Sequence, residues 1–189
     1  MLPIPVDVGR SSMHRGFTAR CVSRIARHQA INGVIARAIT AAGVPVTKEP
    51  VGLVRLDGKR PDGLTLIPMQ GGKPLTWDVT VVSTLADSCL HSTSHSAGSA
   101  AETASHRKET KYSFLPLDFI FQPVAIETLG PLNTSAVNFL SEVVRRLTSL
   151  SGDSRETSFL FQRLSMLIQH FNSALIMDSF CFSDEDPDL

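Results

Sequence analysis

Two aspartates are the residues best suited to chemistry in this sequence. Asp62 begins one predicted strand and Asp78 lies inside the next, with a Gly-Gly pair between them that fits a hairpin turn. If the turn pairs the strands, both carboxylates reach one edge of the hairpin. Mg²⁺ is bound in this way, by one or two carboxylates together with water and substrate phosphate. The pattern therefore predicts Asp62 and Asp78 as catalytic ligands of Mg²⁺, or of Mn²⁺, that act on a phosphate ester.

Two lysines follow on a predicted helix. Lys108 and Lys111 are three residues apart, so they share one helix face, and Tyr112 adds a phenol beside them. A cation there could orient the attacking water or neutralise the phosphate. Lysines on a helix are more often solvated, and an aspartate at a strand start is more often a turn residue. Asp78 is the sharper signal, because a carboxylate in a buried strand needs a partner or a function.

The basic residues are concentrated near the start of the chain. Residues 1–60 hold ten Lys/Arg and three Asp/Glu, whereas residues 61–189 hold eight and fifteen. Such a segment favours a polyanionic partner. Arg24, His28 and Asn32 recur at four-residue intervals, with Arg27 beside them, and this face could contact phosphates. The alternative is an ordinary polar helix exterior.

Apolar periodicity predicts the elements that must position these residues. Helices are expected over 20–42, 97–113, 134–150 and 154–177, and strands over 44–49, 62–68, 75–82 and 119–128. The serine- and histidine-rich segment 83–96 is expected to be a loop. Pro123 predicts a bulge or an edge strand. The resulting order, α-β-β-β-α-β-α-α, predicts an α/β domain over 19–180, with an irregular basic leader over 1–18 and an acidic disordered tail over 181–189.

Several function classes lack their motifs in this sequence. It has no apolar run of the ~20 residues that a membrane helix needs, no secretory signal, no P-loop and no G-x-S-x-G serine nucleophile. Its three cysteines form neither a disulfide framework nor a C-x-x-C pair. These absences predict an intracellular protein, nuclear or cytoplasmic and not secreted, without a membrane partner.

A series of motifs over residues 20–180 resembles the restriction-like endonuclease region at the C-terminus of R2-type non-LTR retrotransposon polyproteins. The motifs are R-H-Q-A-I-N (27–32), Arg60-Pro61-Asp62, Asp78 within W-D-V-T-V, Lys108-x-x-Lys111-Tyr112, P-V-A-I-E-T-L-G (123–130) and G-D-S-R-E-T-S-F-L-F-Q-R-L-S (152–165). The resemblance implies a PD-(D/E)xK nuclease with a restriction-endonuclease-like α-β-β-β-α-β core and two additional C-terminal helices. It also implies Mg²⁺-dependent nicking of target DNA, whose free 3′ end primes reverse transcription.

The resemblance assigns roles to individual residues. Asp62 and Asp78 are the metal ligands, and Lys108 or Lys111 is the catalytic lysine, because Thr80 stands where the usual lysine would be. The expected nucleic-acid-binding residues are Arg24, Arg27, His28, Asn32, Arg60 and Tyr112. DNA is the expected partner, with a reverse transcriptase or element RNA as a further one.

The chain departs from the family in two ways. His14 and Cys21 are all that is present of a zinc knuckle, which needs four ligands, and the sequence contains no Y/F-x-D-D polymerase motif. A detached fragment or relic of such a polyprotein is therefore expected. Three points stay open: a catalytically inactive nucleic-acid-binding module, a protein-interaction role for helices 134–177, and a place for Glu127 in the metal site.

Overall fold

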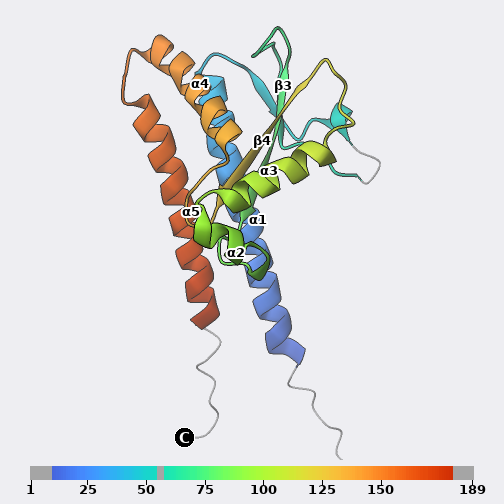
Figure 1. The fold of residues 1–189 in the computed structure, drawn as a ribbon, viewed down its shortest axis with the longest axis vertical. Helices are drawn as coiled ribbons and strands as arrows, with labels where there is room; N and C mark the ends of the chain where they lie inside the picture. The colour runs from blue at the N-terminus through green and yellow to red at the C-terminus, as the bar shows by residue number, and fades with distance from the viewer. Residues whose placement is uncertain (1–9, 55–57, 181–189) are drawn as a thin grey trace, which may run out of the picture.

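A computed structural model describes residues 10–54 and 58–180, with side chains for 24–54 and 58–177. Figure 1 shows the arrangement of the elements. In chain order they are α1 (Arg10–Ala41), β1 (Val46–Lys48), the 3₁₀ helix η1 (Val51–Leu53), β2 (Gly63–Thr65), β3 (Leu75–Val82), α2 (Asp87–His95), α3 (Ser99–Lys111), β4 (Ile120–Glu127), α4 (Thr134–Ser151) and α5 (Glu156–Phe180).

The described strands form a four-stranded mixed sheet in the order β1-β2-β3-β4. Strand β2 runs antiparallel to both β1 and β3, whereas β3 and β4 run parallel. This arrangement confirms the predicted α/β class. Pro123 lies on β4, an edge strand of the sheet, where it pairs with Asp78 of β3. An edge strand tolerates proline because one of its sides needs no backbone donor.

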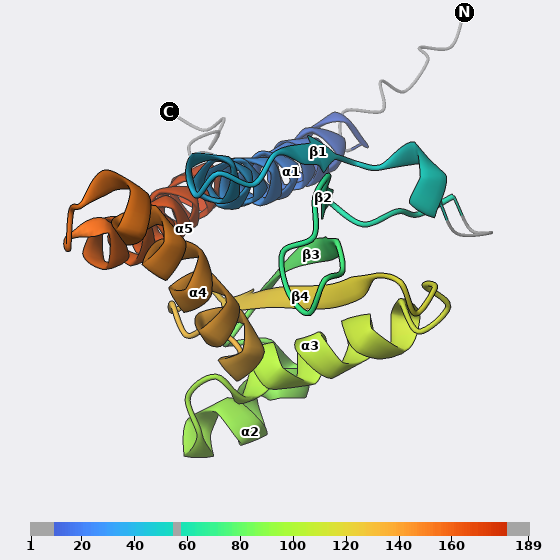
Figure 2. The same cartoon turned by 90° about the horizontal axis from the view of Figure 1, so that it is seen from above.

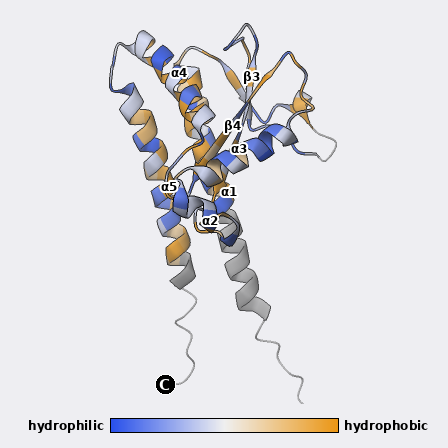
Figure 3. Cartoon of the chain, in the orientation of Figure 1, coloured by the Kyte–Doolittle hydropathy of each residue, from blue (hydrophilic) through white to orange (hydrophobic). Residues whose placement is uncertain are grey.

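The sheet lies between two helical layers (Figure 2). One face packs against α1, α4 and α5 and holds the main core, which includes Ile35, Trp77 and Leu140. The other face packs against α3 through small residues, Ala101 and Ala104 against the Ala125 of β4. Figure 3 accordingly shows apolar colours along β4, alternating apolar and polar colours along α4, and mainly polar colours along α3.

Strand β3 places alternate side chains on these two faces, as its sequence predicts. Trp77 and Val79 enter the main core, and Asp78 between them faces α3. The position of Trp77 depends on Gly63 of β2, because a Cβ atom at Gly63 would lie 2.1 Å from the Trp77 ring. The indole N–H in turn donates to Asn32 Oδ1 over 2.8 Å and so fastens α1 to the sheet.

Two sequence predictions about the elements were wrong: the start of the first helix and the predicted loop over 83–96. Helix α1 begins at Arg10, so residues 10–18 of the expected irregular leader are helical; Pro3 and Pro5 precede it, and a lone glycine costs a helix only about 1 kcal/mol. Segment 83–96, expected to be a loop, contains α2. Its hydroxyl side chains bond to carbonyls within their own helix, as Thr93 does to Cys89, and this satisfies them without a loop.

Other sequence predictions fall partly or wholly outside the described residues. Residues 1–9 and the acidic tail 181–189 are among these, as are the side chains of His14 and Cys21. Over the ranges that are described, none of the helices has the length and apolarity needed to cross a membrane.

Candidate active site

Asp62 immediately precedes β2, and Asp78 lies in the neighbouring strand β3. Gly63 pairs with Trp77, and the Asp62 N–H donates to the Trp77 carbonyl over 2.9 Å, which places the two aspartates one register step further on. Strand β2 begins only at Gly63, so the Asp62 carboxylate occupies the position beyond its end. There Oδ2 accepts the main-chain N–H of Val79 over 2.6 Å.

Helix α1 contacts the Asp62 carboxylate through His28. The imidazole Nε2 lies 2.9 Å from Asp62 Oδ2 and 3.1 Å from the Val79 carbonyl oxygen. Both partners are acceptors, so Nε2 carries a hydrogen. The hydrogen bond to Asp62 raises the pKa of His28 above its ordinary value; burial opposes this shift, and the charges of Asp62 and Asp78 reinforce it.

Helix α3 contacts the Asp78 carboxylate through two side chains. Asp78 is only 4% exposed. Its Oδ1 lies 2.5 Å from the Lys108 ammonium, and its Oδ2 accepts the Tyr112 hydroxyl over 2.5 Å. The Tyr112 oxygen is also 3.0 Å from the Arg60 carbonyl oxygen, so the same phenol ties the segment before Asp62 to α3.

The two predicted lysines have different surroundings. Lys108 Nζ contacts Asp78 directly, whereas Lys111 Nζ lies 3.2 Å from the Tyr112 hydroxyl and 4.6 Å from the centre of its ring. Of the two lysines, Lys108 is therefore the one that contacts Asp78 directly.

Carboxylate and carbonyl oxygens are the ligands that a hard divalent cation prefers. Such oxygens here belong to the carboxylates of Asp62 and Asp78 and to the carbonyl of Val79, and at present His28 and Lys108 contact them. No group of three or more His, Cys, Asp and Glu that could hold a metal occurs among the described residues. A site of two carboxylates, completed by water and substrate phosphate, matches the way Mg²⁺ is bound and does not match a structural zinc site.

Glu127, which the sequence left open as a third ligand, has another role. It is 1% exposed at the end of β4, and its Oε1 accepts the N–H groups of Ala100 and Ala101 over 2.9 and 3.3 Å. Its Oε2 lies 3.4 Å from the Thr84 hydroxyl. A carboxylate in this position stabilises the N-terminus of α3, where N–H groups lack helical partners. The structure therefore places Glu127 away from the acidic pair and gives it an anchoring role.

Next to the acidic pair is a cleft of about 690 Å³, here called the basic cleft. It lies among α1, α5 and the end of β3. Its charged lining comes from Arg24, Arg27, His28 and Lys108, and none of its lining residues is acidic. Because His28 and Lys108 also contact the two carboxylates, the basic cleft opens directly beside the acidic pair.

Two of the predicted nucleic-acid contacts are corrected by their burial. Asn32 is 7% exposed, and its amide serves Trp77 and the Asp62 carbonyl within the protein. Tyr112 is 2% exposed and bonded to Asp78. Neither residue lines the basic cleft, and both side chains hold the site together.

The remaining predicted contacts are placed differently from one another. Arg24 is exposed at the cleft, and Arg27 lines it from a buried position. Arg60 lies outside the cleft lining and forms an ion pair with Glu49. The cleft therefore gathers Arg24, Arg27 and His28 and leaves Arg60 out.

No protein-family model matches this sequence, and no curated protein matches it either. The function is therefore inferred from the geometry of the acidic pair and the basic cleft.

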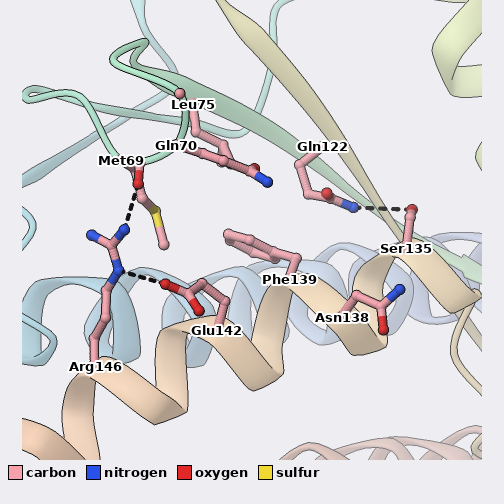
Figure 4. A pocket seen from close by; sticks show the side chains of 10 residues that line it. Met69, Gln70, Leu75, Gln122, Ser135, Asn138, Phe139, Glu142 and Arg146 are labelled. Atoms are coloured by element: carbon pink, nitrogen blue, oxygen red, sulfur yellow. Dashed lines mark hydrogen bonds and ion pairs between the residues drawn. The ribbon is translucent and has the colours of Figure 1, made fainter.

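A second cavity, of about 540 Å³, lies between α4 and the hairpin turn and contains none of the predicted site residues (Figure 4). Arg146 spans it, bonded to Glu142 and to the Met69 carbonyl, and Gln122 bonds to Ser135. Its prominent polar side chains thus bond to one another, and it has no link to the acidic pair.

Sequence reasoning missed one polar residue that helps to build the basic cleft, Asn172. Asn172 of α5 lines the cleft and donates from Nδ2 to the carbonyl of Thr128, which follows β4, over 2.6 Å. Asn172 is a polar residue on a helix that the sequence predicts from its apolar positions, and no local motif identifies it. Its separation of 145 residues from its partner Arg27 also hides the contact from any pattern of spacing.

Proposed function

We propose that this protein is a Mg²⁺-dependent DNA endonuclease with a restriction-endonuclease-like core. One observation carries the proposal: the Asp62 carboxylate bonds to the main chain of β3, the Asp78 carboxylate of β3 bonds to Lys108 of α3, and Lys108 lines a cleft whose charged residues are all basic. Carboxylate oxygens suit a hard cation, the lysine suits a phosphate, and the cleft suits a polyanionic strand. Together they fit hydrolysis of a phosphodiester.

The proposed reaction divides the work among the residues. Asp62 and Asp78 would hold Mg²⁺, which when bound lowers the pKa of water and stabilises charge on phosphate. Lys108 would turn from Asp78 toward the scissile phosphate and neutralise its growing negative charge. Water would attack phosphorus and release a proton to solvent, the P–O3′ bond would break, and the 3′ oxygen would take a proton from solvent, which leaves a 5′-phosphate and a 3′-hydroxyl.

Three further residues would hold these groups in place. Asn32 supports the Asp62 main chain, His28 orients the Asp62 carboxylate, and Tyr112 orients Asp78. Such supporting hydrogen bonds fix the geometry of ligand carboxylates. The motif resemblance extends the proposal to target-site nicking for a retroelement, because a 3′-hydroxyl at a nick can prime DNA synthesis.

A plasmid assay tests the proposal. The wild-type protein with Mg²⁺ is expected to convert supercoiled DNA to the open-circular form. Asp78→Asn should reduce the rate by at least about 100-fold, equivalent to roughly 2.7 kcal/mol of transition-state stabilisation, and should leave DNA binding in EDTA intact. Glu142→Gln, the same chemical change on α4 away from the acidic pair, is the matched control and should nick like the wild type.

A second candidate is a catalytically inactive nucleic-acid-binding module. It is favoured by the contacts of His28 and Lys108, which already occupy the carboxylate oxygens that a metal would need. A wild-type protein that binds DNA but never nicks it, with Mg²⁺ or Mn²⁺, would establish this second candidate and remove the first.

A further inference from the structure

Arg27 is buried in the wall of the basic cleft, and no residue that the structure describes forms an ion pair with it. It is 6% exposed, and its Nε, which is fully buried, has no hydrogen-bond partner among the described residues. Its guanidinium NH1 donates to Asn172 Oδ1 over 3.3 Å. Burial, together with the repulsion from Arg24, lowers the pKa of Arg27. Within the described ranges no carboxylate comes close enough to pair with it.

A buried guanidinium without an anion is costly for the folded state, because its lost hydration is not replaced. Asn172 does not offset this cost, since it supplies only one neutral acceptor. Its own amide is held by the Thr128 carbonyl over 2.6 Å, so its Oδ1 keeps a fixed direction toward Arg27. The guanidinium is therefore held in place in the cleft lining, and its Nε has no hydrogen-bond partner among the described residues.

The planar fork of an arginine matches the oxygens of a phosphate, which it binds through two parallel hydrogen bonds. Arg24 is exposed on the same helix and adds positive charge at the cleft. Leu85, Leu129 and Leu175 also line the cleft and provide an apolar wall for a sugar or base. The cleft thus offers positive charge for the phosphate of a nucleotide and apolar surface for its sugar or base.

We infer that Arg27, held by Asn172, forms a second phosphate site that binds a DNA backbone phosphate next to the scissile one. His28 and Lys108 join this site to the acidic pair, since both line the same cleft. The inference rests on the proposed function for the choice of DNA and for the neighbouring scissile phosphate. The second site itself needs no metal, and Asn172 acts in it as a positioning residue.

The test measures binding of a fluorescent DNA duplex in EDTA over a range of salt concentrations. One lost phosphate contact lowers the slope of log K against log salt by about 0.9, and Arg27→Gln is expected to show this loss and about tenfold weaker binding. Arg37→Gln removes the same charge from an exposed position of α1 outside the basic cleft and is expected to keep the wild-type slope. Arg27→Lys keeps the charge but not the fork, so it should weaken binding with the slope unchanged.

Thermal unfolding without DNA separates ligand binding from a structural role. Arg27→Met removes an unpaired buried charge and is expected to unfold at the same or a higher temperature than the wild type, while it binds DNA more weakly. Asn172→Ala should weaken binding in the wild-type background and add nothing to Arg27→Gln. Inorganic phosphate alone should raise the unfolding temperature far less than the duplex does.

The outcomes distinguish this inference from the nuclease proposal. An Arg27→Gln slope equal to that of the wild type overturns the phosphate site even if the protein nicks plasmid. If the slope of log K against log salt is shallower for Arg27→Gln, and the wild-type protein never nicks, the phosphate site is supported and the nuclease proposal is removed. Phosphate alone matching the effect of the duplex would make this a free-anion site and overturn the assignment to DNA.

Discussion

The ammonium of Lys108 on α3 lies 2.5 Å from Oδ1 of Asp78, a residue 30 positions earlier on β3. The position two residues after Asp78, where the resemblance places a lysine, is Thr80, and it lines the basic cleft. The lysine that faces the carboxylate therefore comes from a helix instead of from the strand. The ion pair is largely buried, with 22% and 5% of the two side chains exposed, so each partner depends strongly on the other.

Replacement of Lys108 should affect both stability and nicking. Lys108→Met removes the ammonium that contacts the buried Asp78 carboxylate, which should lower the free energy of unfolding by about 3 kcal/mol. Urea unfolding measures this loss, and adding Asp78→Asn to Lys108→Met should recover part of it. Lys111→Met is the matched control: it removes a lysine from the same helix that stacks on Tyr112, and should cost less than about 1 kcal/mol. A larger loss of nicking in Lys111→Met than in Lys108→Met would contradict the assignment of Lys108.

A methyl group at Gly63 should disturb the site without touching its charges. Gly63→Ala would put a Cβ atom 2.1 Å from the ring of Trp77, which is fully buried and cannot move away. We expect a loss of about 1–3 kcal/mol, typical of overpacking, measured by urea unfolding. Gly52→Ala is the control, because nothing lies within 4 Å of its Cβ position. Equal stabilities of the two variants would show that the Trp77 packing is looser than described.

The strands that carry the acidic pair were predictable because their signals are local. Segment 75–82 alternates between two chemical environments, and β3 has the same bounds. Both glycines of the predicted turn adopt left-handed φ values of 55° and 72°, which glycine adopts without strain. The hairpin places the backbones of Asp62 and Asp78 at neighbouring positions, and this placement could be inferred before any contact was known.

The choice between the lysines and the role of His28 could not be predicted from spacing. Positions 108 and 111 share a helix face, and only the docking of α3 on the sheet decides which ammonium meets Asp78. His28 belongs to a face that spacing alone cannot distinguish from a solvated one. Its partner Asp62 is 34 residues away, and local periodicity carries no information about contacts at that range.

The hydrogen bond between His28 and Asp62 should appear as a pH dependence of stability in the metal-free protein. The folded-state pKa of His28 is raised, so its contribution is fully present below about pH 6.5, the unfolded value, and is lost as the pH rises through the folded value. His28→Gln should flatten this part of the profile of unfolding free energy against pH. Asp62→Asn should move the His28 titration, followed by NMR, back toward the unfolded value. An unshifted His28 titration in the wild-type protein would rule out the contact.

Glu142 gives a second pH prediction at a site away from the acidic pair. Hydrogen bonds from Arg145 and Arg146 lower its pKa to about 2, so its stabilising contribution is present above the unfolded value of 4.5 and is lost as the pH falls toward 2. The carboxylate is largely solvated, and screening should reduce the effect to less than about 1 kcal/mol. Glu142→Gln should therefore slightly reduce stability near neutral pH and narrow its difference from the wild type in acid. Salt at high concentration should reduce the same difference, and a difference insensitive to both would contradict the ion-pair origin.

Glu127 provides the sharpest distinction between a metal ligand and a structural anchor. Its carboxylate accepts two N–H groups at the start of α3, so Glu127→Gln should lower the free energy of unfolding by about 1–2 kcal/mol through the loss of a charged acceptor at a helix N-terminus. The Mg²⁺ concentration needed for half-maximal nicking should stay within about twofold of the wild-type value, whereas Asp62→Asn should raise it far more. Because α3 carries Lys108, a small drop in the maximal rate is expected from a less firmly held helix. A Mg²⁺ requirement in Glu127→Gln as high as in Asp62→Asn would show that Glu127 reaches the metal, and that the anchoring contact is broken when the site is filled.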